Sequence, residues 1–277
     1  MSANQSPPSQ AATTHSKQYH IHPHVEYLKQ VPQFEQRTPA WYDRRKTLMT
    51  ASNVAAALSI KPFDSFQGDP REEAINQIVY GTFKGNVATR HGQKYEDSIR
   101  DRFDEIMGTK TLELGLIVHS DVHGEEHGLN WLGASLDGIT NTGAAVEIKC
   151  PWRREIDPLE IPHHYVPQIL VQMEVCNLEI GYFVQWQPAW LAKDGVEVFS
   201  IQTIQRDRAW FEQNKPLMKS FYDDLMHARA NYVPPPPPPK LIRDALYHDI
   251  SHAKASRMAF LEDTDDVETR QPLFLDD

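Results

Sequence analysis

The spacing of apolar residues predicts helices and strands that follow one another along the chain. Residues 89–107 predict an amphipathic helix that ends at Gly108, with one apolar face made by Tyr95, Ile99, Phe103 and Ile106. Strict alternation of apolar and polar positions predicts one continuous strand at residues 111–119.

Further elements complete an α/β domain with a central mixed β-sheet flanked by helices. Two short helices, at residues 38–45 and 52–60, are expected before the sheet, and a third at residues 209–232 closes the domain. Residues 181–190 and 195–204 predict two strands joined around the sequence KDG.

A helix at residues 164–176 carries two kinds of side chain. We expect Ile169, Leu170 and Met173 to point inward, whereas Tyr165, Gln168 and Gln172 share the other side.

The sequence VEIKC combines an apolar face with a charged one. Alternation places Val146, Ile148 and Cys150 on one face of a strand, and Glu147 and Lys149 on the other.

The sequence NTG, which ends in Gly143, predicts a three-residue hairpin turn centred on Thr142. Asp137 and Glu147 lie equally far from that centre, so the turn sets them opposite each other, with Cβ atoms roughly 4.5–5.5 Å apart.

Two opposed carboxylates destabilise a sheet unless a cation lies between them. A hard divalent ion such as Mg²⁺ resolves the conflict, and Lys149 adds positive charge for a phosphoryl oxyanion or a metal-bound water. The alternative is a solvated sheet face on which Asp137 and Lys149 pair diagonally. The register favours the metal site.

Composition indicates an intracellular, soluble protein, with nothing to distinguish nucleus from cytoplasm. The 277 residues, 40% of them hydrophobic, suit one medium-sized domain with tails or at most two domains, and no membrane-spanning run or signal segment is expected. Two cysteines are too few for a disulfide framework, a four-cysteine zinc site or an iron–sulfur cluster.

The net charge of −10 argues at first against a nucleic-acid partner, since phosphate contacts come mostly from Lys and Arg. However, residues 262–277 hold seven acids and one arginine, so the remainder of the chain is much closer to neutral.

The composition predicts four regions. These are a disordered N-terminal tail at 1–24, the folded domain at 25–233, a polyproline linker at 234–239 and an acidic C-terminal tail at 240–277.

Four motifs in one chain order resemble the lambda-type recombination exonucleases, the YqaJ-like viral recombinase or alkaline exonuclease family of the PD-(D/E)XK nuclease superfamily. The motifs are WYDRRKTLMTAS, GQKYE, ASLDG with EIKCP, and YVPQILVQM. The resemblance runs from about Trp41 to Trp186 and implies a restriction-endonuclease-like core.

The resemblance implies a catalytic set. It makes Asp137 and Glu147 metal ligands together with the backbone carbonyl of Ile148, and it makes Lys149 the catalytic lysine. Glu96 matches a glutamate that completes the acidic cluster through water, and Gln168 matches a glutamine near the catalytic water. The implied cofactor is Mg²⁺ or Mn²⁺.

The resemblance also implies an end-binding pocket, in which Arg45, Ser52 and Ser135 hold the 5′ phosphate of the strand being cut. An arginine fork with two hydroxyl donors is a chemically sensible anion site.

Three positions depart from the family pattern. Leu136 stands where the family has proline, Asp121 is the candidate for an additional upstream metal-binding aspartate, and Lys84 or Arg90 replaces a phosphate-binding lysine.

The leading hypothesis is a Mg²⁺-dependent exonuclease that degrades double-stranded DNA from 5′-phosphorylated ends and leaves 3′ single strands for recombination or repair. The alternative is a structure- or site-specific PD-(D/E)XK endonuclease, and a different class is a catalytically silent scaffold that binds through its polyproline and acidic tail. The partners implied are double-stranded DNA, further copies of the chain in a homo-oligomer and a single-strand annealing protein, with no membrane.

Overall fold

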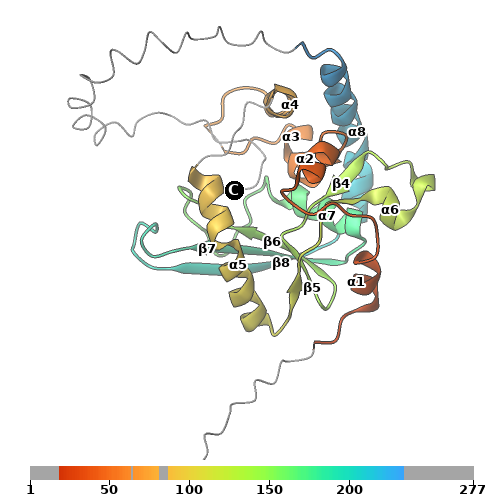
Figure 1. Cartoon of the computed structure of the whole chain (residues 1–277). Coiled ribbons are helices and arrows are strands. Elements are labelled where there is room, and N and C mark those ends of the chain that lie inside the picture. The colour runs from red at the N-terminus through yellow and green to blue at the C-terminus, as the bar shows by residue number, and fades with distance from the viewer. Residues whose placement is uncertain (1–18, 64, 81–86, 234–277) are drawn as a thin grey trace, which may run out of the picture.

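The computed structural model describes residues 19–63, 65–80 and 87–233. Two mixed sheets form the centre, one with strand order β2-β5-β6-β7-β8 and a smaller one with order β1-β4-β3 (Figure 1). Within the larger sheet only β6 and β7 run parallel. The expected α/β class with a mixed sheet is confirmed.

The strands are β1 (Met49–Thr50), β2 (Thr111–Leu112), β3 (Ile117–Val118), β4 (Leu132–Ala134), β5 (Gly138–Thr140), β6 (Ala144–Lys149), β7 (Ile180–Gln187) and β8 (Val198–Gln205). The helices are α1 (Pro23–Leu28), α2 (Pro39–Arg45), α3 (Val54–Ala57), α4 (Pro70–Tyr80), α5 (Val87–Met107), α6 (His119–His123), α7 (Val166–Cys176) and α8 (Arg208–Ala230), with short 3₁₀ turns η1 (Ala51–Asn53) and η2 (Glu125–His127).

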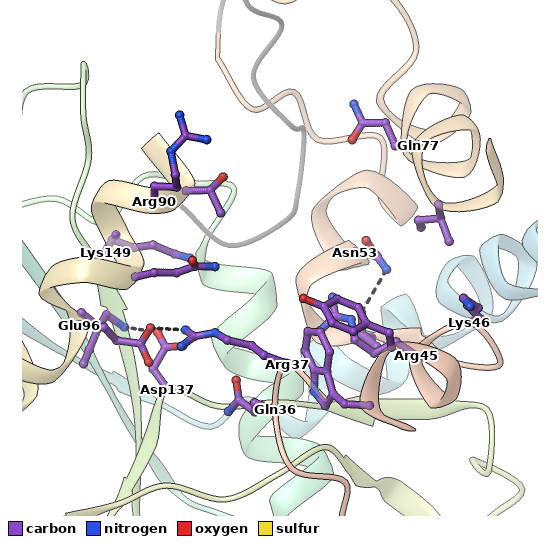
Figure 2. Close-up of a pocket in the computed structure, with 18 of the residues that line it drawn as sticks. Gln36, Arg37, Arg45, Lys46, Asn53, Gln77, Arg90, Glu96, Asp137 and Lys149 are labelled. Atoms are coloured by element: carbon purple, nitrogen blue, oxygen red, sulfur yellow. Dashed lines mark hydrogen bonds and ion pairs between the residues drawn. The ribbon is translucent and has the colours of Figure 1, made fainter. Parts of the chain in front are cut away.

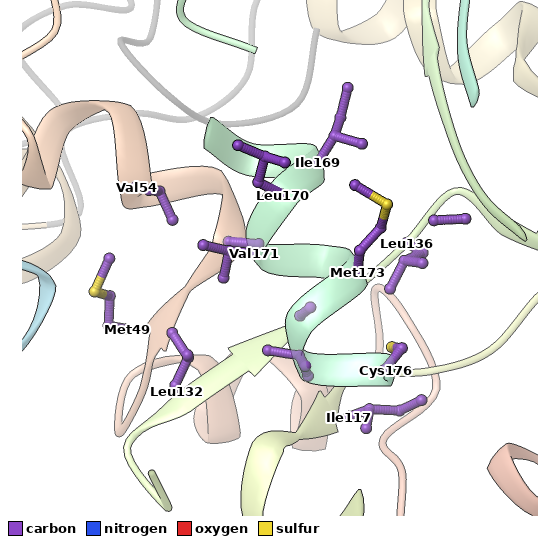
Figure 3. Packing of buried hydrophobic residues seen from close by; sticks show 14 of the residues in the cluster. Met49, Val54, Ile117, Leu132, Leu136, Ile169, Leu170, Val171, Met173 and Cys176 are labelled. Carbon is purple, nitrogen blue, oxygen red and sulfur yellow. The ribbon is translucent and has the colours of Figure 1, made fainter. Parts of the chain in front are cut away.

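The five-stranded sheet is covered on both faces. On one face α5 packs Ile99 and Phe103 against Val146, Ile148 and other apolar residues of β6 and β7. On the other face lies the larger core, which surrounds α7 and joins it to α3, α8 and the three-stranded sheet (Figure 3). Burial on both faces explains why β6 has no exposed residue.

Helix α2 begins where the sequence predicted. The Thr38 side chain accepts a hydrogen bond from the Trp41 backbone N–H, and Pro39 occupies the first helical position. The second predicted helix is divided into η1 and α3, and β1 lies between it and α2, so the two helices do not both precede the sheets as expected.

The single strand expected at residues 111–119 is wrong. β2 pairs with β5 in the larger sheet, whereas β3 pairs with β4 in the smaller one. The chain changes sheets at Gly115, where a Cβ atom would lie 2.2 Å from the Phe34 carbonyl oxygen. The close approach of another backbone segment therefore ends the strand.

Helix α5 and the β7–β8 hairpin are confirmed, with Gly108 and Gly195 at positive φ (67° and 70°) after the helix and in the hairpin turn. Ile106 is an exception on the expected apolar face of α5, because it is 55% exposed.

The described chain starts at residue 19, inside the predicted tail. The His22 N–H donates to the Asn141 carbonyl oxygen at 2.8 Å, and α1 buries Val25 and Leu28 in the larger core. The domain start at residue 25 stays a prediction. The polyproline linker and the acidic tail lie outside the described residues. Over the described part of the chain, every helix is too short or too polar to span a bilayer.

Candidate active site

The hairpin of β5 and β6 has the predicted register. Gly138 pairs with Val146 and Ile139 with Ala145, and Gly143 takes a positive φ of 92° in the turn. One step further along this ladder, Asp137 lies opposite Glu147. The Asp137 Oδ2 atom accepts a hydrogen bond from the Ile148 N–H at 2.7 Å, which fixes the carboxylate against β6.

Glu147 lies at the centre of a buried polar cluster. Its side chain accepts hydrogen bonds from Gln168 at Oε1 and from Gln172 at Oε2, both 2.6 Å long, and the Lys149 Nζ lies 3.0 Å from Oε1. Opposite charge and amide donors thus compensate a carboxylate that would otherwise be very costly to bury.

The alternative of a solvated sheet face is wrong. Glu147 is 1% and Lys149 2% exposed, and both lie on the α7 side of the sheet. Ile148 and Cys150 pack on the opposite side, against the α5 cluster. The predicted division of VEIKC into two faces is therefore confirmed.

A cavity of about 580 Å³ lies in front of this hairpin (Figure 2). Asp137, Ile148 and Lys149 line it, whereas Glu147 lies behind them. In Figure 2 the acidic end, with Asp137 and Glu96, faces Arg45 and Asn53 across the cavity.

Glu96 projects from α5 into the same cavity and is held by two arginines. Its Oε2 accepts from Arg37 at 2.6 Å, and its Oε1 accepts from the buried Arg100 one turn later at 3.0 Å. Glu96 thus lies on the cavity with Asp137, and its action through water stays a prediction.

The three residues assigned to the 5′ phosphate belong to one network around Trp41. Arg45 donates to the Ser52 Oγ at 3.1 Å and lies over the Trp41 ring, 4.3 Å from its centroid. The Trp41 indole N–H in turn donates to the Ser135 Oγ at 2.9 Å. The structure therefore gathers Arg45, Ser52 and Ser135, although they come from α2, η1 and the end of β4.

Two titratable side chains close to Lys149, those of Cys150 and His164, are uncharged at neutral pH. Burial raises the pKa of the Cys150 thiol to about 12, so this residue is not a nucleophile at neutral pH. Burial, followed by the nearby positive charges of His163, Arg154 and Lys149, lowers the pKa of His164 to about 3.

The structure also places the residues proposed for positions at which the sequence departs from the family pattern. Arg90 lines the cavity, Lys84 lies outside the described residues, and Asp121 lies on α6 rather than on this cavity. Burial raises the pKa of the Asp121 carboxyl.

Several residues that line the cavity were not singled out from the sequence, among them Arg37, Asn53 and Arg229. The i,i+4 spacing of Glu96 and Arg100 could have shown that this glutamate is paired. No comparable local signal connects Arg37 or Arg229 to the site, because each is brought there by the tertiary fold.

No three-carboxylate centre is found in the described ranges: no group of three or more His, Cys, Asp or Glu side chains there is placed to hold a metal ion. The metal ligands expected from the sequence, which are Asp137, Glu147, the Ile148 carbonyl and, through water, Glu96, stay a prediction.

The sequence model of the YqaJ-like viral recombinase domain matches residues 40–179, which is just over half of the chain and includes every predicted site residue. The chain belongs to this family. The resemblance expected from the sequence motifs is therefore confirmed.

Solved structures share the fold. The alkaline exonuclease LHK-Exo of Laribacter hongkongensis matches with a TM-score of 0.53 and 22% identity, over 79% of this chain and all of that one. Its complex with dAMP matches with a TM-score of 0.52, 23% identity and the same coverage. The restriction-endonuclease-like core is thereby confirmed.

One curated relative is the uncharacterized protein R354 of Acanthamoeba polyphaga mimivirus, 28% identical over 183 residues. The match covers 58% of this YqaJ-like chain and 31% of that protein, so the chain spans less than a third of the relative's length.

Proposed function

We propose that this chain is a Mg²⁺-dependent deoxyribonuclease that degrades double-stranded DNA from 5′-phosphorylated ends and leaves 3′ single strands for recombination or repair. The observation that carries this proposal is one cavity with Asp137 and Lys149 at one end and Arg45 at the other. A DNA end needs both, because its terminal phosphate and its scissile phosphate are separate anions. Membership of the YqaJ-like family supports the same assignment.

The hairpin donors fit a divalent cation. Asp137, Glu147 and the Ile148 carbonyl offer only oxygen, which Mg²⁺ prefers, and Mg²⁺ commonly takes one or two carboxylates and completes its shell with water and substrate phosphate. Each carboxylate oxygen has two lone pairs, so Glu147 can accept the glutamine amides and still contribute a ligand. Mn²⁺ suits the same donors. When bound, such a cation polarises the phosphate and acidifies a water molecule.

Side chains and backbone groups of the hairpin and α7 hold the two carboxylates in place and balance their negative charge. Gln168 and Gln172 fix the Glu147 carboxylate, and the Ile148 N–H fixes that of Asp137. Lys149, held 3.0 Å from Glu147 with its Nζ 5.1 Å from the Tyr165 ring centroid, brings a preorganised positive charge to developing negative charge on the phosphoryl oxygens.

Arg45 would read the end of the strand. Its guanidinium is oriented by stacking on Trp41 and by Ser52, and a planar guanidinium held in this way can bind a phosphate through two parallel hydrogen bonds. Removing such a contact costs about 1.5–3 kcal/mol, or roughly one to two powers of ten in rate.

The test compares linear duplexes that carry a 5′ phosphate or a 5′ hydroxyl, with and without Mg²⁺, at one fixed salt concentration. Arg45→Ala should slow cleavage of the phosphorylated end by roughly 10- to 100-fold and change the hydroxyl end little. Arg45→Lys is the matched control: it keeps the charge without the fork and should recover only part of the rate.

Equal slowing on both ends would remove the end-reading role of Arg45. Cleavage of a covalently closed circle would favour the endonuclease alternative, and undiminished activity without divalent metal would contradict the metal assignment. The homo-oligomer and the annealing partner stay predictions.

A further inference from the structure

A group of aromatic rings lies along α5 and is not used by the proposed reaction. We call it the aromatic ladder; it consists of His91, Tyr95, Trp152, Trp186 and Trp190. The His91 ring lies 5.1 Å from Trp152 and 5.6 Å from Trp190, between centroids, and the two indoles are 5.8 Å apart. Tyr95 joins His91 at 4.9 Å to Trp186 at 5.0 Å.

The two ends of the ladder differ in burial. Tyr95 and Trp186 pack against the core cluster under α5, and the Trp186 N–H donates to Glu197 at 2.6 Å. At the other end Trp190, in the turn after β7, is 61% exposed and Trp152 is half-buried, whereas the His91 ring that both contact is only 6% exposed.

The exposed end lies beside the catalytic cavity. α5 presents Arg90 and Gln93 to the cavity, and it presents His91 to the two tryptophans. Trp152 follows the cavity-lining Cys150 by two residues. Figure 1 shows the β7–β8 hairpin reaching outward past α5. Trp152 and Trp190 therefore lie next to residues that border the cavity, through Arg90 beside His91 and through Cys150.

The charge around the ladder suits a polyanion. Arg90 lies at the cavity wall, Lys94 lies with its Nζ 5.0 Å from the Tyr95 ring centroid, and Arg153 follows Trp152. Burial and the charge of Lys94 lower the pKa of His91, so the ring that packs against the two indoles carries no charge at physiological pH.

We infer that Trp190 and the half-buried Trp152, the two indoles at the exposed end of the aromatic ladder, bind unpaired nucleotides of single-stranded DNA by base stacking, and that the buried His91 ring supports them from below. Aromatic faces accept any base, and neighbouring cations follow the phosphate backbone, which is how sequence-tolerant single-strand sites are built. This inference deepens the proposed function and rests on it for the source of the unpaired strand, which is the strand left behind as its complement is removed.

The experiment measures binding separately from cleavage. The full chain is titrated without divalent metal, at one salt concentration, against a fluorescent oligothymidylate of about 16 nucleotides, the upper end of what one single-strand-binding module covers. Trp190→Ala and Trp152→Ala should each weaken binding by about fivefold to 100-fold, the range for losing one stacked base. Affinity for a blunt duplex should change far less.

Two matched variants separate stacking from structure. Trp190→Phe keeps an aromatic face and should retain most of the affinity, and Leu217→Ala, a truncation on α8 at a residue that is 52% exposed, should change nothing. Wild-type affinity in Trp190→Ala would overturn the inference, as would a wild-type chain that binds the single strand no better than duplex.

Cleavage of duplex ends with Mg²⁺ is then measured on the same proteins. Suppose that the wild-type chain cuts duplex ends and that Trp190→Ala binds the single strand as tightly as the wild type. The inference about the aromatic ladder is then wrong, and the proposed function stands. Suppose instead that Trp190→Ala weakens single-strand binding but the wild-type chain cuts no DNA. The proposed function is then wrong, and the inference about the aromatic ladder stands.

Discussion

At the scale of single residues, compensation of charge decides how the candidate site is built. Asp137 and Glu147 are like charges on adjacent strands, yet each is satisfied separately, the first by a backbone N–H and the second by Lys149 and two glutamines. Their removal should therefore have unequal effects on stability.

Glu147→Ala should lower the free energy of unfolding by about 3–5 kcal/mol, because it removes one partner of a buried ion pair and leaves the Lys149 ammonium buried. Asp137→Asn should cost less than about 1.5 kcal/mol, since the amide oxygen can still accept from the Ile148 N–H. Both should abolish cleavage. Urea denaturation checks the two stabilities, and equal losses would contradict this account of the pair.

Arg37 combines a strained backbone with a functional position. Its φ is 65°, a region that costs L-residues about 1–2 kcal/mol, and its guanidinium holds Glu96 in the cavity. Arg37→Gly and Arg37→Ala remove the same ion pair, but glycine also relieves the strain. After the entropy cost of glycine, the Gly variant should be more stable by about 1 kcal/mol.

Arg44, in the ordinary helical conformation of α2, is the matched control for this comparison. At position 44 the Arg44→Ala variant should have a free energy of unfolding about 1 kcal/mol higher than that of Arg44→Gly. The same order of stability at both positions would show that the φ of Arg37 is not costly.

At the scale of elements, the change of sheet at Gly115 is the point at which the two sheets are joined. A Cβ at this position would approach the backbone of Phe34 to 2.2 Å, and backbone cannot rotate away as a side chain can. Gly115→Ala should therefore lower the free energy of unfolding by about 1–3 kcal/mol.

Gly138 provides the contrast. Its added Cβ would lie 2.1 Å from the Thr111 methyl group, whereas the next neighbours, the Leu112 carbonyl oxygen at 3.5 Å and the Thr111 Cβ at 3.6 Å, are at ordinary contact distance. Gly138→Ala should therefore be largely rescued by Thr111→Ser. Thermal unfolding of both variants checks this. A harmless Gly115→Ala would mean that the bridge between Phe34 and Leu116 does not fix the crossing.

At the scale of the whole molecule, buried histidines make stability depend on pH. Burial, followed by the neighbouring His123 and His127, lowers the pKa of His119 to about 3. The unfolded chain therefore binds a proton near pH 6.5 that the folded chain refuses until about pH 3, so this contribution to stability is present above pH 6.5 and is lost as the pH falls toward 3.

The His119 and His123 rings stack with their centroids 4.0 Å apart, and His119→Phe keeps an aromatic ring at this position. This variant should lose less stability than the wild type between pH 7 and pH 5. The expected difference is up to about 1.4 kcal/mol per pH unit below the unfolded pKa. Urea midpoints at each pH give the slope, and parallel slopes in both proteins would contradict the assignment to His119.

The sequence by itself determined what depends on local period and spacing. Alternation placed Glu147 and Lys149 on one face of β6, and the NTG turn fixed the register that sets Asp137 against Glu147. Helix caps and glycines likewise located α2 and the end of α5. These features depend on near neighbours in the chain, so the local sequence is sufficient to specify them.

Only the tertiary structure decided which distant groups meet. It divided residues 111–119 between two sheets because the Phe34 backbone lies against Gly115, and it brought Arg37 to Glu96 and Arg229 to the cavity wall. It also made Gln168 and Gln172 buried partners of Glu147 rather than one side of an amphipathic helix, because α7 is enclosed on all sides. Contacts between residues far apart in the chain follow from how whole layers pack, and no local period encodes them.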